Sequence, residues 1–209
     1  MLANELFDKN MDIVKSCLQH PFVAGIASGS LEREKFVYYM SQDAFYLTAY
    51  ARAFALGIAK SPDEKAMRMF KSQVDATFAE LNLHAGYSNK WGFSLDVSPA
   101  KATLNYTNFL ERVAAFDDIG SIAAATLPCS ILYAYLGTEL SQDFNPSTPY
   151  KSWIDTYSSA EFKQGTAVLE SLVNEYGVDE HKIRTYYRRA MELEYDFFAA
   201  AYKSTNNKI

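Results

Sequence analysis

The stretch FVYYMSQDAFYL, residues 36–47, decides the fold class of this chain. Its apolar residues Phe36, Met40, Ala44 and Leu47 recur at the intervals that place side chains on one face of a helix. The strict alternation and the enrichment in Val, Ile and Thr that mark a strand are missing here and along the rest of the chain. The sequence therefore predicts an all-α protein built as a helical bundle.

Capping residues indicate where further helices begin on either side of this stretch. Ser30 precedes one helix, and Ser61 with Pro62 and Glu64 forms a capping box that predicts another. Asp179 is expected to begin the last helix. The helices predicted in this way are residues 3–19, 31–59, 62–91, 99–116, 118–138, 151–158, 160–176 and 180–204.

Length and composition limit the class of protein. A chain of 209 residues, 49% hydrophobic and 22% charged, is expected to form a single helical domain over residues 1–209 without disulfides. Its formal net charge is −5 and its basic residues are scattered, which argues against a nucleic-acid partner. No uninterrupted apolar run approaches the ~20 residues that span a bilayer, and the first residues lack a secretion signal. We therefore expect a cytoplasmic protein with no membrane partner.

Tyrosine is unusually frequent for a helical bundle. The chain has 15 tyrosines and 14 phenylalanines, so aromatic residues make up 15% of it. A buried tyrosine hydroxyl requires a hydrogen-bond partner. Several tyrosines on apolar helix faces therefore indicate either a hydrogen-bonded core or a cavity lined with hydroxyl groups, and composition alone favours the core.

The motifs of several enzyme classes are missing, including phosphate-binding loops and zinc-protease signatures. Three histidines, His20, His84 and His181, are too few for a multi-histidine metal centre. Glu80 and His84 share a helix face, but a di-iron bundle needs a Glu-x-x-His pair on each of two helices. We therefore expect a hydrogen-bonded pair on that face and neither a metal nor a cofactor. His20 is expected to complement the dipole at a helix C-terminus rather than to bind haem.

Three side chains of the sequence could carry chemistry. Cys129 follows Pro128 in a helical pattern, where the missing proline N–H is expected to kink the helix and open space beside it. Asp43 and Glu194 lie on aromatic helix faces, where a carboxyl group is either at the solvent-exposed rim or buried with a shifted pKa. Taken singly, each has a simpler interpretation: a small buried apolar residue for the cysteine, and rim positions for the acids.

Seven segments taken together resemble the TenA family, the thiaminase II-type aminopyrimidine aminohydrolases with a haem-oxygenase-like helical fold. The resemblance extends from about residue 5 to 202. Many relatives have Phe-Trp where this chain has Phe197-Phe198, so the packing of the pocket floor is expected to differ. The segments are HPF at 20–22 with Gly29, QDAFYL at 42–47, ELNLH at 80–84, YTNFL at 106–110, LPC at 127–129 with Tyr133, WIDTY at 153–157 and EYDFF at 194–198.

The resemblance implies a role for each residue of the candidate site. Cys129 corresponds to the nucleophile of the cysteine-containing branch of the family. Glu194 corresponds to the acid that bonds a ring nitrogen of the pyrimidine and shuttles protons, and Asp43 to the carboxylate that holds the exocyclic amine and the other ring nitrogen. The tyrosines that match the pocket lining are Tyr46, Tyr106, Tyr133 and Tyr157. The family resemblance also implies a homotetramer.

The implied reaction converts 4-amino-5-aminomethyl-2-methylpyrimidine to hydroxymethylpyrimidine and ammonia, with thiamin as a second candidate substrate. Protonation of a ring nitrogen by Glu194 makes the adjacent carbon electrophilic, and the thiolate of Cys129 adds there. The group on the methylene arm then leaves and water takes its place. Because an ordinary thiol is largely protonated at neutral pH, we expect Tyr106 or Asp43 to assist its deprotonation.

Two other functions stay open on the sequence alone. A haem-oxygenase-like metal oxidase is disfavoured by the shortage of histidine ligands. A regulatory protein that binds a pyrimidine without turnover is disfavoured because binding alone needs no thiol in line with an acid.

Overall fold

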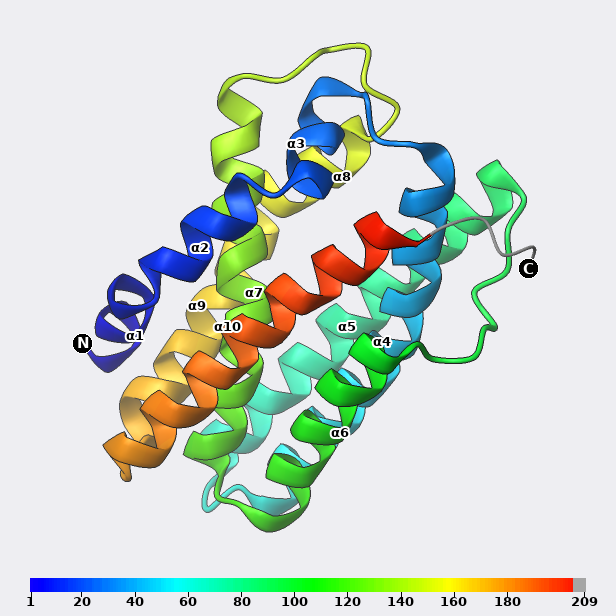
Figure 1. Cartoon of the computed structure of the whole chain (residues 1–209). Coiled ribbons are helices and arrows are strands. Elements are labelled where there is room, and N and C mark those ends of the chain that lie inside the picture. Colours follow the sequence, from blue (N-terminus) through cyan, green and yellow to red (C-terminus); the bar gives the residue numbers. More distant parts are fainter. Residues whose placement is uncertain (205–209) are drawn as a thin grey trace.

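The computed structural model describes residues 1–204, and the regular secondary structure in this range is helical (Figure 1). The prediction of an all-α fold is confirmed. The domain predicted over residues 1–209 includes five residues, 205–209, that lie outside the described range. The helices are α1 (Leu2–Lys9), α2 (Met11–Leu18), α3 (Pro21–Ser28), α4 (Arg33–Lys60), α5 (Glu64–Trp91), α6 (Lys101–Phe116), α7 (Ile119–Gln142), α8 (Lys151–Ser158), α9 (Ala160–Tyr176) and α10 (Glu180–Lys203).

Helix α7 is the central element of the bundle, and it continues through Pro128 to Gln142, beyond the predicted end at residue 138. It packs against α6, α8, α9 and α10. By length and composition alone α7 could cross a membrane, since the mean hydropathy of its most apolar 18-residue window is 1.5. However, 78% of that window is buried inside the protein. Burial by the neighbouring helices therefore accounts for its apolar composition.

The prediction of one N-terminal helix over residues 3–19 is wrong. Helices α1 and α2 are separated at Asn10, whose side-chain Nδ2 donates to the carbonyl of Leu6 at 2.7 Å. Asparagine favours such breaks because its amide competes with the backbone for hydrogen bonds. Helix α3 was not predicted. It begins after His20, whose Nδ1 accepts a hydrogen bond from the Phe22 N–H at 3.2 Å, so His20 caps the start of α3 instead of completing the preceding helix.

Three predicted helix starts, those of α4, α5 and α6, lie two residues before the observed ones. Helix α4 begins at Arg33, two residues after its predicted start. The N-cap of α5 is Asp63, whose Oδ1 accepts from the Ala66 N–H at 2.8 Å. Ser61 belongs to the end of α4, where its hydroxyl donates to the carbonyl of Gly57. The predicted cap of the last helix, Asp179, is confirmed by its bond from the Lys182 N–H at 3.1 Å.

Helix α6 is capped by a residue from another helix. Gln42 of α4 accepts hydrogen bonds through Oε1 from the Ala100 N–H at 2.8 Å and from the Thr103 hydroxyl at 2.6 Å. Its Nε2 donates to the carbonyl of Ser98 at 3.1 Å. Since Gln42 is buried and adjacent to Asp43, this cap ties the start of α6 to the part of α4 that carries a candidate site residue.

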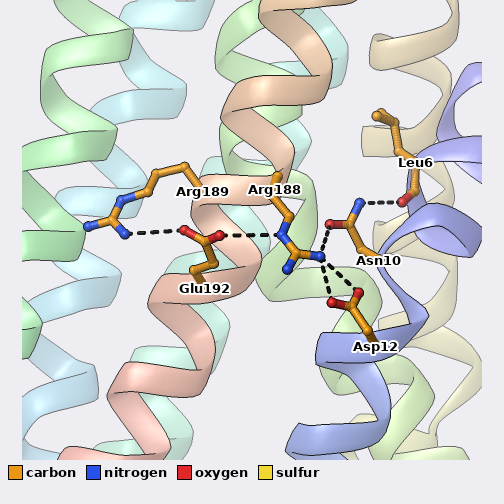
Figure 2. Close-up of polar contacts among 6 residues, drawn as sticks. All are labelled: Leu6, Asn10, Asp12, Arg188, Arg189 and Glu192. Carbon is orange, nitrogen blue, oxygen red and sulfur yellow. Dashed lines mark hydrogen bonds and ion pairs between the residues drawn. The ribbon is translucent and has the colours of Figure 1, made fainter.

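Side chains on the outer face of α10 form hydrogen bonds and ion pairs with the N-terminal segment (Figure 2). Arg188 Nη1 donates to both carboxylate oxygens of Asp12, at 2.8 and 2.9 Å, and to Asn10 Oδ1 at 3.4 Å. Arg188 Nε also contacts Glu192 Oε1 at 3.3 Å. Because exposed ion pairs contribute little stability, these contacts mainly orient α10, whose inner face carries Glu194.

Candidate active site

A cavity of about 290 Å³ lies between α5, α7 and α9. Cys129 of α7 and Glu80 of α5 line it, together with Phe162 of α9. Of the residues predicted for the site, Cys129 is the one on the cavity wall. The other six are buried in the surrounding helices, and their contacts decide whether they belong to the same site: Asp43, Tyr46, Tyr106, Tyr133, Tyr157 and Glu194.

Cys129 of α7 is half-buried and lines the cavity. Burial raises the pKa of this thiol well above its usual value. Three carboxyl groups close enough to act on the sulfur, those of Glu194, Glu80 and Asp43, raise that pKa further. The thiol is therefore protonated at neutral pH, and it becomes a nucleophile only if a neighbour takes its proton.

Glu194 lies on the inner face of α10 with 2% of its surface exposed. It accepts a hydrogen bond through Oε1 from the hydroxyl of Tyr106 at 2.7 Å. Burial raises the pKa of Glu194 to about 8, although Tyr106 and Cys129 act in the opposite direction. At neutral pH this side chain is therefore largely in the acid form and can donate a proton.

Asp43 is paired with His84, which the sequence analysis did not assign to the site. His84 Nε2 lies 2.7 Å from Asp43 Oδ2, and His84 Nδ1 lies 2.9 Å from the backbone carbonyl of Glu80. A backbone carbonyl only accepts hydrogen bonds, so His84 Nδ1 donates to Glu80, and Nε2 is the ring nitrogen that meets Asp43. Burial lowers the pKa of His84, but its contacts with Asp43 outweigh burial and the net shift is upward. The pair is thus buried and hydrogen-bonded, and Asp43 favours the protonated form of His84.

Glu80 was also missed as a site residue. Its Oε1 accepts a hydrogen bond from the Tyr157 hydroxyl at 2.6 Å. Burial raises the pKa of Glu80 to about 7, and the charge of Asp43 adds to the shift, whereas His84 and Tyr157 oppose it. The predicted bond between Glu80 and His84 exists only through the Glu80 backbone. The signal that could have identified both residues is their four-residue spacing inside a family-like segment.

The tyrosines surround Cys129 and the carboxyl groups. Tyr46 and Tyr106 pack with ring centroids 4.7 Å apart, and Tyr133 and Tyr157 with centroids 4.9 Å apart. The hydroxyl of Tyr46 is buried without a hydrogen-bond partner among residues 1–204, close enough to Cys129 to lower the pKa of the thiol. A buried hydroxyl without a partner is costly, so this group is available to a ligand or to the sulfur.

Together these residues place a thiol, a proton donor and a carboxyl group paired with a histidine among aromatic rings. The family model of the TENA/THI-4/PQQC family matches residues 8–204 of the chain. The chain belongs to this family. Aminopyrimidine aminohydrolase from Halalkalibacterium halodurans is 35% identical over 96% of this chain and 95% of its own length. Aminopyrimidine aminohydrolase from Helicobacter pylori is 33% identical, covering 97% of this chain and 99% of its own length.

Solved structures of TenA proteins share the fold. A TenA family transcription regulator from Silicibacter sp. TM1040 superposes with a TM-score of 0.90 at 26% identity, covering 98% of this chain and 97% of that protein. A TenA homologue from Pyrococcus furiosus gives a TM-score of 0.90 at 22% identity, which shows the fold alone. The resemblance to the TenA family inferred from seven sequence segments is therefore confirmed.

Phe197 and Phe198, where the chain differs from the TenA pattern, pack against tyrosines of the site. Phe198 is fully buried and stacks on Tyr133 with centroids 5.6 Å apart, and on Phe22 with centroids 5.7 Å apart. Phe197 packs against Tyr46 at 6.2 Å. Neither side chain has a polar group, so the departure affects the shape of the aromatic wall and not the proton donors.

Within residues 1–204, no group of three or more His, Cys, Asp and Glu side chains is arranged to hold a metal ion. The acidic side chains of the site are instead occupied by tyrosine hydroxyls and by His84. This donor set suits proton transfer and the binding of a planar ring with hydrogen-bonding edges.

Proposed function

We propose that this chain is an aminopyrimidine aminohydrolase of thiamin salvage. It converts 4-amino-5-aminomethyl-2-methylpyrimidine and water to hydroxymethylpyrimidine and ammonia. Two relatives that match nearly the whole chain carry that name. The observation that carries the proposal is the Cys129 thiol beside the acid form of Glu194, at a cavity of about 290 Å³. Ligand pockets measure about 300–1,000 Å³, so this volume suits a small ring.

Glu194 and Cys129 act together in the first step. The thiol passes its proton to Glu194 while Glu194 passes its own proton to a ring nitrogen, and the sulfur bonds to the adjacent ring carbon. This coupling suits two groups whose pKa values are both raised, because no isolated thiolate is formed in the buried site. Glu194 is better placed to take the thiol proton than Tyr106, which donates to Glu194, or Asp43, which is bound to His84.

Asp43 and the tyrosines bind the ring. Asp43 binds the exocyclic amine and the other ring nitrogen, and its hydrogen bond with His84 holds the carboxyl group in place. The free hydroxyl of Tyr46 adds a donor beside the sulfur. The rings of Tyr106 and Tyr133 supply flat apolar surface for stacking.

Three further features belong to this proposal. Thiamin is a second substrate, because its pyrimidine carries the same methylene arm. The protein is a homotetramer, and it acts in the cytoplasm. Light scattering coupled to size-exclusion chromatography tests the tetramer directly, and subcellular fractionation tests the location.

The deciding experiment measures ammonia release from the aminopyrimidine, and thiamin cleavage in parallel, for the wild type and Cys129→Ala. We expect turnover by the wild type and loss of both activities in the variant. Cys17→Ala is the matched control, since Cys17 is a buried thiol that does not line the cavity, and this variant should keep a kcat far above that of Cys129→Ala. Full hydrolysis by Cys129→Ser would remove the nucleophile assignment. Tight pyrimidine binding without ammonia release would favour a regulatory protein instead.

A further inference from the structure

The proposed reaction leaves one acid at the cavity without a role. Glu80 lines the cavity together with Cys129, and Asp43 and Glu194 are buried close to these two residues. Its Oε1 is held by the Tyr157 hydroxyl at 2.6 Å. Its Oε2 makes no hydrogen bond to the described part of the chain. One oxygen of Glu80 is therefore fixed by the protein, and the other is free to meet a ligand in the cavity.

The backbone around Glu80 is fixed as well. Its carbonyl is bonded to His84 Nδ1 at 2.9 Å, and the other nitrogen of that ring is bonded to Asp43 of α4. Glu80 is thus held by α5 and α4 through its main chain, and by α8 through Tyr157. Such support on rigid elements keeps a catalytic group within the narrow geometry that proton transfer requires.

The chemistry of the arm calls for a group of this kind. The aminomethyl group of the substrate is an ammonium ion at neutral pH, as alkylamines are. After the ring has added the thiol, the attacking water must lose a proton. Glu194 interacts with Tyr106 and Cys129 and acts on the ring nitrogen. A second group must therefore bind the methylene arm and accept the proton of the attacking water.

We propose that Glu80 is a further catalytic residue, which binds the cationic methylene arm and then accepts the proton of the attacking water. This inference rests on the proposed function. When the C–N bond breaks, the electron pair leaves with the nitrogen as ammonia, and an exocyclic methylene remains on the ring. Water oxygen bonds to that carbon while its proton passes to Glu80. The C–S bond then breaks, the ring-nitrogen proton returns through Glu194 to the sulfur, and Glu80 passes its proton to the departing ammonia.

The environment of Glu80 suits a base that works at neutral pH. Its pKa of about 7 lies near the pH at which the reaction runs, which favours general-base catalysis. Burial and Asp43 raise that pKa, and a cationic arm entering the cavity lowers it again. The substrate therefore promotes the ionised form of Glu80 that the water step requires.

The test is a pre-steady-state comparison of the wild type with Glu80→Gln, using the aminopyrimidine. We expect the variant to release about one ammonia per site and then to stall, with steady-state kcat reduced roughly 10²–10⁴-fold. Intact-protein mass spectrometry should then show the pyrimidine adduct on Cys129. Azide, which attacks carbon without losing a proton, should restore turnover and yield the azidomethylpyrimidine.

Several controls separate this role from a structural one. Glu64→Gln changes an exposed acid of the same helix that contacts only Arg68, and should leave all rates unchanged. Glu80→Asp keeps a carboxyl group and should retain more activity than Glu80→Gln. A Glu80→Gln variant with wild-type kcat, or with a low kcat that shows neither adduct nor azide product, would overturn the inference. A wild type that releases no ammonia would instead overturn the proposed function.

Discussion

Three carboxyl groups and one histidine share a buried site, and their environments assign them different protonation states. Asp43 is paired with His84, and this contact raises the pKa of the histidine. Burial raises the pKa values of Glu194 and Glu80 to about 8 and about 7, although His84 lowers that of Glu80. Groups of one chemical type that are held apart in pKa can serve as acid, base and fixed charge within one reaction.

The two raised pKa values predict a bell-shaped dependence of kcat/KM on pH. Activity should fall below about pH 7 because Glu80 must be ionised to act as a base. It should fall above about pH 8 because Glu194 must be protonated to act as an acid. The titratable groups near Glu80 are His84 on its own helix and, on the neighbouring helices, Tyr39, Asp43 and Tyr50 on α4, Cys129 on α7, Tyr157 on α8, Glu161 on α9 and Glu194 on α10.

Initial rates of ammonia release at low substrate concentration, measured from roughly pH 5 to pH 10, check this prediction. In the residual activity of Glu80→Gln, the acid limb should disappear while the alkaline limb stays. A wild-type profile that is flat across neutral pH would contradict the assignment of both groups. An acid limb that persists in Glu80→Gln would contradict the assignment of Glu80 alone.

The close contact between helices α7 and α8 sets the position of Tyr157, which is hydrogen-bonded to Glu80. A Cβ atom placed on Gly137 of α7 would lie 2.5 Å from the backbone carbon of Tyr157 and 2.6 Å from the nitrogen of Ser158. Only a residue without a side chain permits this approach. The contact therefore sets the position of Tyr157, whose hydroxyl holds Glu80.

Gly137→Ala should push α8 away from α7. We expect a loss of about 1–3 kcal/mol in the free energy of unfolding, as for other overpacked contacts. We also expect the acid limb of the pH profile to move to higher pH, because the Tyr157 hydrogen bond that lowers the pKa of Glu80 is weakened. Urea denaturation and the pH dependence of kcat/KM measure the two effects.

Gly86→Ala is the control for this substitution. Gly86 lies in α5, and a Cβ atom there would meet nothing within 4 Å. Alanine favours a helix over glycine by about 1 kcal/mol, so stability should stay equal or rise. If both variants gave the same pH profile as the wild type, Tyr157 would not govern the pKa of Glu80.

The sequence predicted those helices whose apolar face or capping residue lies within or next to their own residues. The apolar face of residues 36–47 and the cap at Asp179 correspond to real helices, α4 and α10. The start of α6 was misplaced because its first N–H is capped by Gln42, which lies 58 residues away in the sequence. Helix α3 was missed because PFVAGIAS is short and apolar throughout, without the periodicity of an amphipathic helix.

The residues of the candidate site also fall into those with a local sequence signal and those without one. Cys129, Asp43 and Glu194 stood out because each is unusual in its own segment. The site roles of Glu80 and His84 depend on where α4, α7 and α8 lie relative to α5, and a four-residue spacing alone does not reveal them. The sequence therefore singled out the three candidate reactive groups but not the side chains that contact them in the fold.

At the scale of the whole molecule, the buried acids couple folding to protonation. Glu194 and Glu80 keep their protons up to about pH 8 and about pH 7 in the folded state, whereas an unfolded chain releases them near pH 4.3. The folded state therefore binds more protons in this interval, and its stability decreases as pH rises. His84 acts in the same direction, since its pKa is raised on folding and its stabilising effect is lost as it deprotonates.

We therefore predict that the free energy of unfolding is smaller at about pH 8.5 than at about pH 5.5, by at most a few kcal/mol. Exposed acids whose pKa values are lowered, such as Asp12 and Asp63, work in the opposite direction but titrate below this interval.

Glu194→Gln removes the largest of the buried shifts, so the variant should depend less on pH and exceed the wild type in stability at the alkaline end while losing activity. Urea denaturation of both proteins at one protein concentration measures the difference. Equal pH dependence in the two proteins would mean that Glu194 is ionised in the folded state, and its role as proton donor would then be lost as well.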